Sequence, residues 1–167
     1  MSGGAAAGET WDELARLAAR PDGVAEPEVP RQLLVFTVDG TAYAAPVESV
    51  REIVRMRPIT PIPRVESDIR GVISLRGEII QVVDLRRRLG MAPAAPSRSS
   101  RIVVLQAGDD LVAGLLVDGV REVIRVAEAD IVPPLEEGAG VQALCRRGDA
   151  FVSLHALDHV LGFDRGV

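Results

Sequence analysis

Short apolar runs separated by polar turns cover most of the chain, a pattern typical of β-strands rather than of long helices. The run "LLVFTV" (33–38) is followed by Asp39-Gly40 and then by "TAYAAPV" (41–47). Glycine accepts the positive φ that a tight turn requires, and an Asp-Gly pair between two apolar runs is a strong hairpin signal. We therefore predict a β-hairpin over 33–47.

A second hairpin is predicted further along the chain. "GVISL" (71–75) and "EIIQVVD" (78–84) flank Arg76-Gly77. The segment "LRRRLG" (85–90) that follows is expected to form a short helix that ends at its glycine, because glycine readily adopts the left-handed conformation found after helices.

The second half of the chain repeats the first. "VESVREIVR" (47–55) matches "VDGVREVIR" (117–125) at an offset of 120 − 50 = 70, and "RGEIIQVVDL" (76–85) matches "RGDAFVSLHA" (147–156) at an offset of 71. A linker rich in proline, alanine and serine separates the two copies. Self-similarity of this kind predicts two copies of one small β unit of about five short strands, which close into barrels to remove exposed edges.

These observations predict a mainly β protein with one extension and two lobes. Residues 1–30 form a flexible N-terminal extension, and residues 31–162 form a domain of two intertwined barrel lobes, at about 31–92 and 100–162.

The extension contains "TWDELARLAAR" (10–20), which reads as a short amphipathic helix. Thr10 and Glu13 have the spacing of a capping box, and Pro21 ends the segment. Two interpretations stay open: a peptide that docks on another protein, or a frayed tail or helix that packs on its own domain.

The amino-acid composition argues against nucleic-acid binding and against insertion into a membrane. The chain has 167 residues, a net charge of −5 and 3% aromatic residues, and all of its 19 basic residues are arginines. An acidic chain with few rings lacks both the positive field and the stacking surfaces that nucleic-acid binders use. A single cysteine, no signal peptide and no apolar run near 20 residues lead us to expect a cytoplasmic protein without membrane insertion.

The candidate chemistry is weak. His155 and His159 have a spacing that could hold a metal on a helix, but the segment lacks the glutamate of a zinc-protease motif. Asp109-Asp110 fits a hairpin turn better than acid–base catalysis. We expect no enzyme activity, no metal and no cofactor.

Two charged features allow more than one interpretation. The three arginines at 86–88 are expected to lie on a solvated helix, with contact to an acidic protein as the next alternative. Strand alternation would place Glu52 on one face with Val50 and Val54, where a charge needs a partner. Glu52 either forms an internal salt bridge, for which Arg76 is the candidate partner, or also borders a groove between the lobes.

Three segments of the chain together resemble the CheW family of chemotaxis coupling proteins. They are "LLVFTVDGTAYAAPVESVREIVR" (33–55), "GVISLRGEIIQVVDLRRRLG" (71–90) and "LVAGLLVDGVREV" (111–123). The resemblance implies two SH3-like five-stranded barrels and no enzymatic activity. It also implies two partners, the cytoplasmic hairpin tip of a methyl-accepting chemoreceptor and the regulatory domain of a CheA-type histidine kinase, with other CheW-like proteins as a further possibility.

The family motifs also imply site residues when they are carried over position by position. The expected receptor-binding groove is lined by Val47, Val50, Glu52, Ile53, Arg76, Ile102, Val120 and Val123. The expected kinase-binding surface lies near Gly71 and Gly77, where small residues permit close approach.

Three functions are therefore compared. The preferred one is a scaffold that couples receptors to a kinase in a chemosensory array. The second is a CheW-like regulator or decoy that binds only one of the two partners, and the third is a small-barrel nucleic-acid-binding protein, against which composition argues.

Overall fold

The computed structural model describes residues 29–134 and 141–155. The predicted helix at 10–20 lies outside the described residues. The elements are β1 (Arg31–Val38), β2 (Thr41–Pro46), the 3₁₀ turn η1 (Val47–Ser49), β3 (Val50–Arg55), β4 (Ile69–Leu75), β5 (Glu78–Asp84), α2 (Leu85–Arg88), β6 (Arg101–Ala107), β7 (Leu111–Val117), β8 (Gly119–Val126), η2 (Glu128–Asp130), β9 (Ile131–Val132), β10 (Val141–Arg147) and β11 (Ala150–His155).

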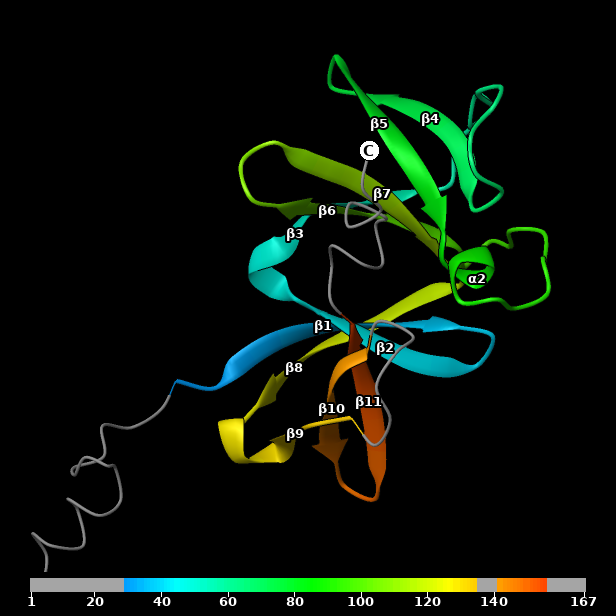
Figure 1. The fold of residues 1–167 in the computed structure, drawn as a ribbon. Coiled ribbons are helices and arrows are strands. Elements are labelled where there is room, and N and C mark those ends of the chain that lie inside the picture. Colours follow the sequence, from blue (N-terminus) through cyan, green and yellow to red (C-terminus); the bar gives the residue numbers. More distant parts are fainter. Residues whose placement is uncertain (1–28, 135–140, 156–167) are drawn as a thin grey trace, which may run out of the picture. The chain divides into compact units, whose positions relative to one another are not determined.

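The strands form two sheets, which Figure 1 shows as two separate groups of arrows. One sheet has the order β8-β1-β2-β11-β10-β9, and the other has the order β3-β6-β7-β5-β4. The mainly β fold predicted from the sequence is confirmed. Both predicted hairpins are present, and their turn residues Asp39, Gly40, Arg76 and Gly77 all have positive φ.

Each sheet takes strands from both halves of the chain, so the lobe boundaries expected at about 31–92 and 100–162 do not separate the sheets. The hairpin β1–β2 pairs with β8 and β11, which come from the second half. The hairpin β6–β7 pairs with β3 and β5, which come from the first half. The two repeats thus exchange their first hairpins.

The exchange makes the two sheets equivalent. The strands β8-β1-β2-β11-β10 of one sheet correspond, in this order, to the strands β3-β6-β7-β5-β4 of the other. In both sheets the two hairpins meet through one parallel pair, β2 with β11 and β7 with β5. The short strand β9 extends the first sheet beyond β10. A single bridge between Thr60 and Val72 lies at the corresponding edge of the second sheet.

The apolar runs at β1 and β6 are continuous because both faces of these strands are buried. On β1, Leu34 and Phe36 belong to the core between the two sheets, whereas Leu33 and Val35 belong to the core of the six-stranded sheet. On β6, the odd and even positions are divided in the same way between the core between the sheets and the core of the five-stranded sheet. A strand buried on both faces has no polar face to alternate with.

Within the described part of the chain, no helix is long and apolar enough to cross a membrane.

Candidate functional site

An extra residue in β3 determines which side chains face the core between the sheets. Val50 pairs with Leu105 and Ile53 pairs with Val103, while Arg51 interrupts the register. Leu105 and Val103 both belong to the core between the sheets. Residues paired directly across strands share a face, so this β-bulge places Val50 and Ile53 on the same face although they are three residues apart.

Strand β8 has the same bulge at the equivalent place. Val120 pairs with Phe36 and Val123 pairs with Leu34, and the extra residue is Arg121. Phe36 and Leu34 also belong to the core between the sheets. Val120 and Val123 therefore face this core from the edge of the other sheet.

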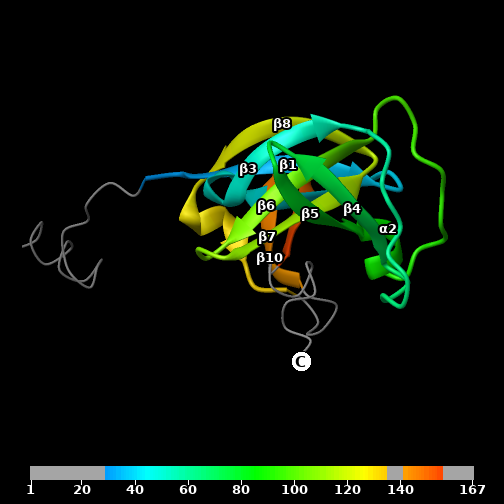
Figure 2. The same cartoon turned by 90° about the horizontal axis from the view of Figure 1, so that it is seen from above.

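The turn η1 and the two edge strands β3 and β8 carry a set of aliphatic side chains that is only partly covered. Val47, Val50 and Val120 are half-buried and pack against the core between the sheets. Ile53 is 40% exposed and Val123 is 52% exposed. We call these five residues the aliphatic strip. Strands β3 and β8 lie on the same side of the molecule in both views (Figures 1 and 2), so the two parts of the strip flank one side of the core between the sheets.

Glu52 lies on the opposite face from the strip. It pairs across the strands with Val104, which belongs to the core of the five-stranded sheet, and its carboxylate accepts hydrogen bonds from Arg76 Nε and Nη2 at 3.2 and 2.9 Å. The hydrogen bond to Glu52, and then its charge, raise the pKa of Arg76. The internal salt bridge is confirmed, whereas the expected common face of Glu52 and Val50 is wrong because the bulge intervenes.

The other repeat has an equivalent ion pair, between Glu122 and Arg147. Their positions correspond to Glu52 and Arg76 at the offsets of 70 and 71 found in the sequence. In each repeat, one glutamate–arginine pair therefore joins an edge strand to the turn of a hairpin.

Three other predicted site residues have surroundings that the sequence did not indicate. Ile102 is completely buried in the core of the five-stranded sheet and cannot line an accessible groove. A Cβ at Gly71 would lie 2.1 Å from the carbonyl oxygen of Thr60, so the close approach there is made by the chain itself. Gly77 is exposed at a hairpin tip, and nothing lies within 4 Å of the position that a Cβ would take there, which leaves it open to a partner.

The solvated helix expected from the sequence is wrong for Arg86 and Arg88, which are largely covered, whereas Arg87 is exposed. Arg88 is 3% exposed and pairs with Asp68 at 3.0 Å, and Arg87 lies 3.5 Å from Asp84. Arg86 forms an ion pair with Asp118 at 2.7 Å. The leucines on either side of the arginines pack inward: Leu85 is buried and Leu89 packs on the core between the sheets.

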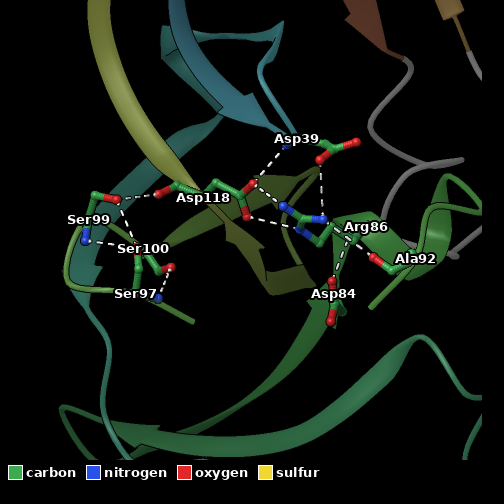
Figure 3. A network of polar contacts seen from close by, with 8 residues as sticks. All are labelled: Asp39, Asp84, Arg86, Ala92, Ser97, Ser99, Ser100 and Asp118. Carbon is green, nitrogen blue, oxygen red and sulfur yellow. Dashed lines mark hydrogen bonds and ion pairs between the residues drawn. The ribbon is translucent and has the colours of Figure 1, made fainter. Parts of the chain in front are cut away.

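Asp118 is the residue at which the chain passes from β7 in one sheet to β8 in the other, and all of its polar groups are bound. Figure 3 shows the contacts of its carboxylate and its carbonyl. Its carboxylate accepts hydrogen bonds from Arg86 and from the N–H of Asp39, its own N–H donates to Thr37, and its carbonyl accepts from the Ser99 hydroxyl. Burial raises the pKa of the Asp118 carboxyl, but the hydrogen bonds from Arg86 and Asp39 outweigh it, and the pKa is lowered.

Candidate catalytic and metal-binding groups are sparse in residues 29–134 and 141–155. No group of three or more histidine, cysteine or acidic side chains in this part of the chain could hold a metal ion. Cys145 is buried, and burial raises the pKa of its thiol, which disfavours the reactive thiolate. His159 lies outside the described residues.

Comparisons with known proteins agree with one another. The family model described as "CheW-like domain" matches residues 32–162. A "Chemotaxis protein CheW" of Rhizobium meliloti is 36% identical over 118 residues, which cover 71% of this chain and 76% of that protein. "Protein FrzA" of Myxococcus xanthus is 37% identical over 110 residues, covering 66% of this chain and 67% of that protein.

A solved structure has the same fold. The scaffolding protein TtCheW from Thermoanaerobacter tengcongensis superposes with a TM-score of 0.74 at 33% identity, covering 78% of this chain and 92% of that one.

Proposed function

The chain belongs to the CheW family of chemotaxis proteins, and we propose that it is a non-enzymatic, cytoplasmic scaffold that couples the tips of chemoreceptors to a CheA-type histidine kinase. The aliphatic strip is the observation that carries this proposal. Five aliphatic side chains on η1 and the edge strands β3 and β8 border the core between the sheets, and two of them, Ile53 and Val123, are 40% and 52% exposed. An exposed apolar patch of this kind is typical of a protein–protein contact.

The proposed occupant of the strip is the cytoplasmic hairpin tip of a chemoreceptor, because the strip offers the kind of surface that an amphipathic helix covers with its apolar face. The kinase domain is proposed to bind elsewhere, at the open hairpin tip around Gly77. Gly71 packs against the backbone of Thr60, so it supports β4 and does not contact the kinase itself. Contact with further CheW-like proteins would extend such an assembly.

The proposal is tested with Ile53→Asp and Val123→Asp. Both side chains are already partly in water, so a carboxylate there should leave folding nearly unchanged and weaken binding to a receptor-tip fragment by about tenfold or more. Co-sedimentation with receptor-tip assemblies and with the kinase regulatory domain measures the two contacts separately. Val50 and Val120 are less suitable positions, because both pack on the core and aspartate there would also destabilise the fold.

Leu111→Asp is the matched control, since Leu111 is 41% exposed at the start of β7, which β6 separates from β3 in the sheet. It should bind like the wild-type chain. Wild-type affinity of the strip variants for the receptor tip would refute the assignment of the strip. Binding of only one partner by the wild-type chain would instead favour the regulator or decoy.

A further inference from the structure

Three arginines near the end of the aliphatic strip have no carboxylate partner among the residues that the structure describes. Arg55, Arg98 and Arg101 line a recess of about 530 Å³ together with Met56 and Ser97. Many other arginines of this part of the chain form ion pairs: Arg51, Arg70, Arg76, Arg86, Arg87, Arg88, Arg146 and Arg147. The recess is thus a local concentration of positive charge on an acidic chain.

Two of these arginines, Arg55 and Arg101, are placed so that their charges destabilise the sheet. Arg55 on β3 and Arg101 on β6 are directly opposite each other, and like charges in this position repel. Arg101 Nη1 donates to the carbonyl oxygens of Arg98 and Ser100 at 2.9 and 2.8 Å, which holds its guanidinium at the recess.

The equivalent place in the other sheet lacks this repulsion. There Arg125 on β8 is opposite Gln32 on β1, and Asp130 lines the pocket beside Arg125. Since the two sheets have the same strand arrangement, the fold itself does not require the pair of arginines. A binding role for Arg55 and Arg101 would account for the difference.

The recess continues the aliphatic strip. Ile53 pairs with Val103, and two residues further along both strands Arg55 pairs with Arg101. Because strand side chains alternate with a period of two, Arg55 is on the same face as Ile53. A partner segment that covers the strip and runs along β3 therefore passes from an aliphatic surface to a basic one.

We propose that the recess receives carboxylates of the receptor tip, from a position just beyond the apolar residues that cover the strip; this inference rests on the proposed function. The planar guanidinium fork of arginine binds carboxylates through two parallel hydrogen bonds. A protein segment suits the site better than a nucleic acid does, because the chain has a net charge of −5 and 3% aromatic residues.

The test compares Arg55→Gln with Arg125→Gln in the full chain. Arg55 has an exposed side chain, so glutamine there removes one charge of the opposed pair, and the midpoint of thermal unfolding should stay equal or rise. Binding to a receptor-tip fragment at low salt should weaken by about three- to tenfold, and the dependence of affinity on salt should become shallower. Arg125→Gln should change neither the affinity nor its salt dependence.

The outcomes separate this inference from the proposed function. If the wild-type chain does not bind the receptor tip, the proposed function fails. If it binds, and Arg55→Gln keeps both the wild-type affinity and its salt dependence, only the acidic contact is refuted. Loss of binding to the kinase regulatory domain alone would refute the receptor as the occupant. Rescue of Arg55→Glu by a tip fragment with a carboxylate replaced by arginine would establish the contact.

Discussion

Gly71 and Gly77 both have positive φ, but only Gly71 is closely packed against another segment of the chain. Gly71 lies against the backbone of Thr60, whereas nothing lies within 4 Å of the Cβ position at Gly77. Thr60 and Val72 exchange two backbone hydrogen bonds of 2.9 Å beside Gly71. A side chain at Gly71 must therefore displace a bonded segment, while one at Gly77 strains only its own residue.

We predict that Gly71→Ala lowers the free energy of unfolding by about 3 kcal/mol, from overpacking together with backbone strain. Gly77→Ala should cost about 1 kcal/mol, from the backbone conformation alone. Urea denaturation of both variants measures the difference. Equal losses would show that the contact with Thr60 does not control stability at Gly71.

At the scale of elements, α2 joins the two sheets through Arg86. This arginine binds Asp118 at the crossing between β7 and β8 and lies 3.5 Å from Asp39 in the β1–β2 turn. Figure 3 shows Asp39, Asp118 and Asp84 grouped around it. A single short helix can thus hold the crossing segment and the exchanged hairpin together.

Arg86→Met should lower the free energy of unfolding by about 1–2 kcal/mol at neutral pH, since it leaves a carboxylate without its charged donor and the site is partly exposed to solvent. The lowered pKa of Asp118 gives the sign of the pH dependence. The ionised Asp118 carboxylate contributes its full stabilisation of the folded state when the pH is above the ordinary carboxyl pKa of 3.8. This stabilisation is lost as the pH falls through the lowered pKa that Asp118 has in the folded protein.

The measurement is the free energy of unfolding of both proteins between neutral pH and about pH 2.5, where an aspartate with an ordinary pKa is mostly protonated. The difference between wild type and Arg86→Met should shrink below about pH 4. A difference that stays constant with pH would mean that Arg86 acts by packing and not through Asp118.

At the scale of the whole molecule, the exchange of hairpins makes each half of the chain incomplete. Residues 29–92 contain β1 and β2 but lack β8 and β11, with which these strands pair. The second half contains β6 and β7 without β3 and β5. Neither half can form a complete sheet from its own strands, and each would expose edges and apolar faces.

We therefore predict that fragments 29–92 and 93–167 do not fold when they are prepared separately and recover the native spectrum when they are mixed. Circular dichroism and the cooperativity of thermal unfolding test both statements. Cooperative unfolding of either fragment alone would contradict the prediction, because it would mean that one half can form a stable sheet without the other.

Much of this protein was determined by local sequence pattern. Short apolar runs, the turn pairs Asp39-Gly40 and Arg76-Gly77 and the internal repeat predicted the strands and both hairpins, and the resemblance of three segments predicted the family. Five aliphatic residues expected on one surface all lie along the core between the sheets: Val47, Val50, Ile53, Val120 and Val123. These features depend on neighbours in sequence, where backbone geometry and side-chain alternation leave a direct signal.

The bulges were missed, although a signal for them existed. Val50 and Ile53 are three residues apart, as are Val120 and Val123, and apolar spacing of three within a strand indicates one extra residue. Simple alternation instead placed Glu52 with Val50.

Only the tertiary structure decided which strands pair, and therefore what each side chain meets. The hairpin exchange, the burial of Ile102, the ion pairs of Arg86, Arg87 and Arg88 and the opposition of Arg55 and Arg101 all join segments far apart in the chain. The two repeats are so alike that either pairing satisfies the local pattern equally well. Which strand pairing forms depends on the total free energy of burying and pairing all the strands together. A local sequence pattern carries no information about that total.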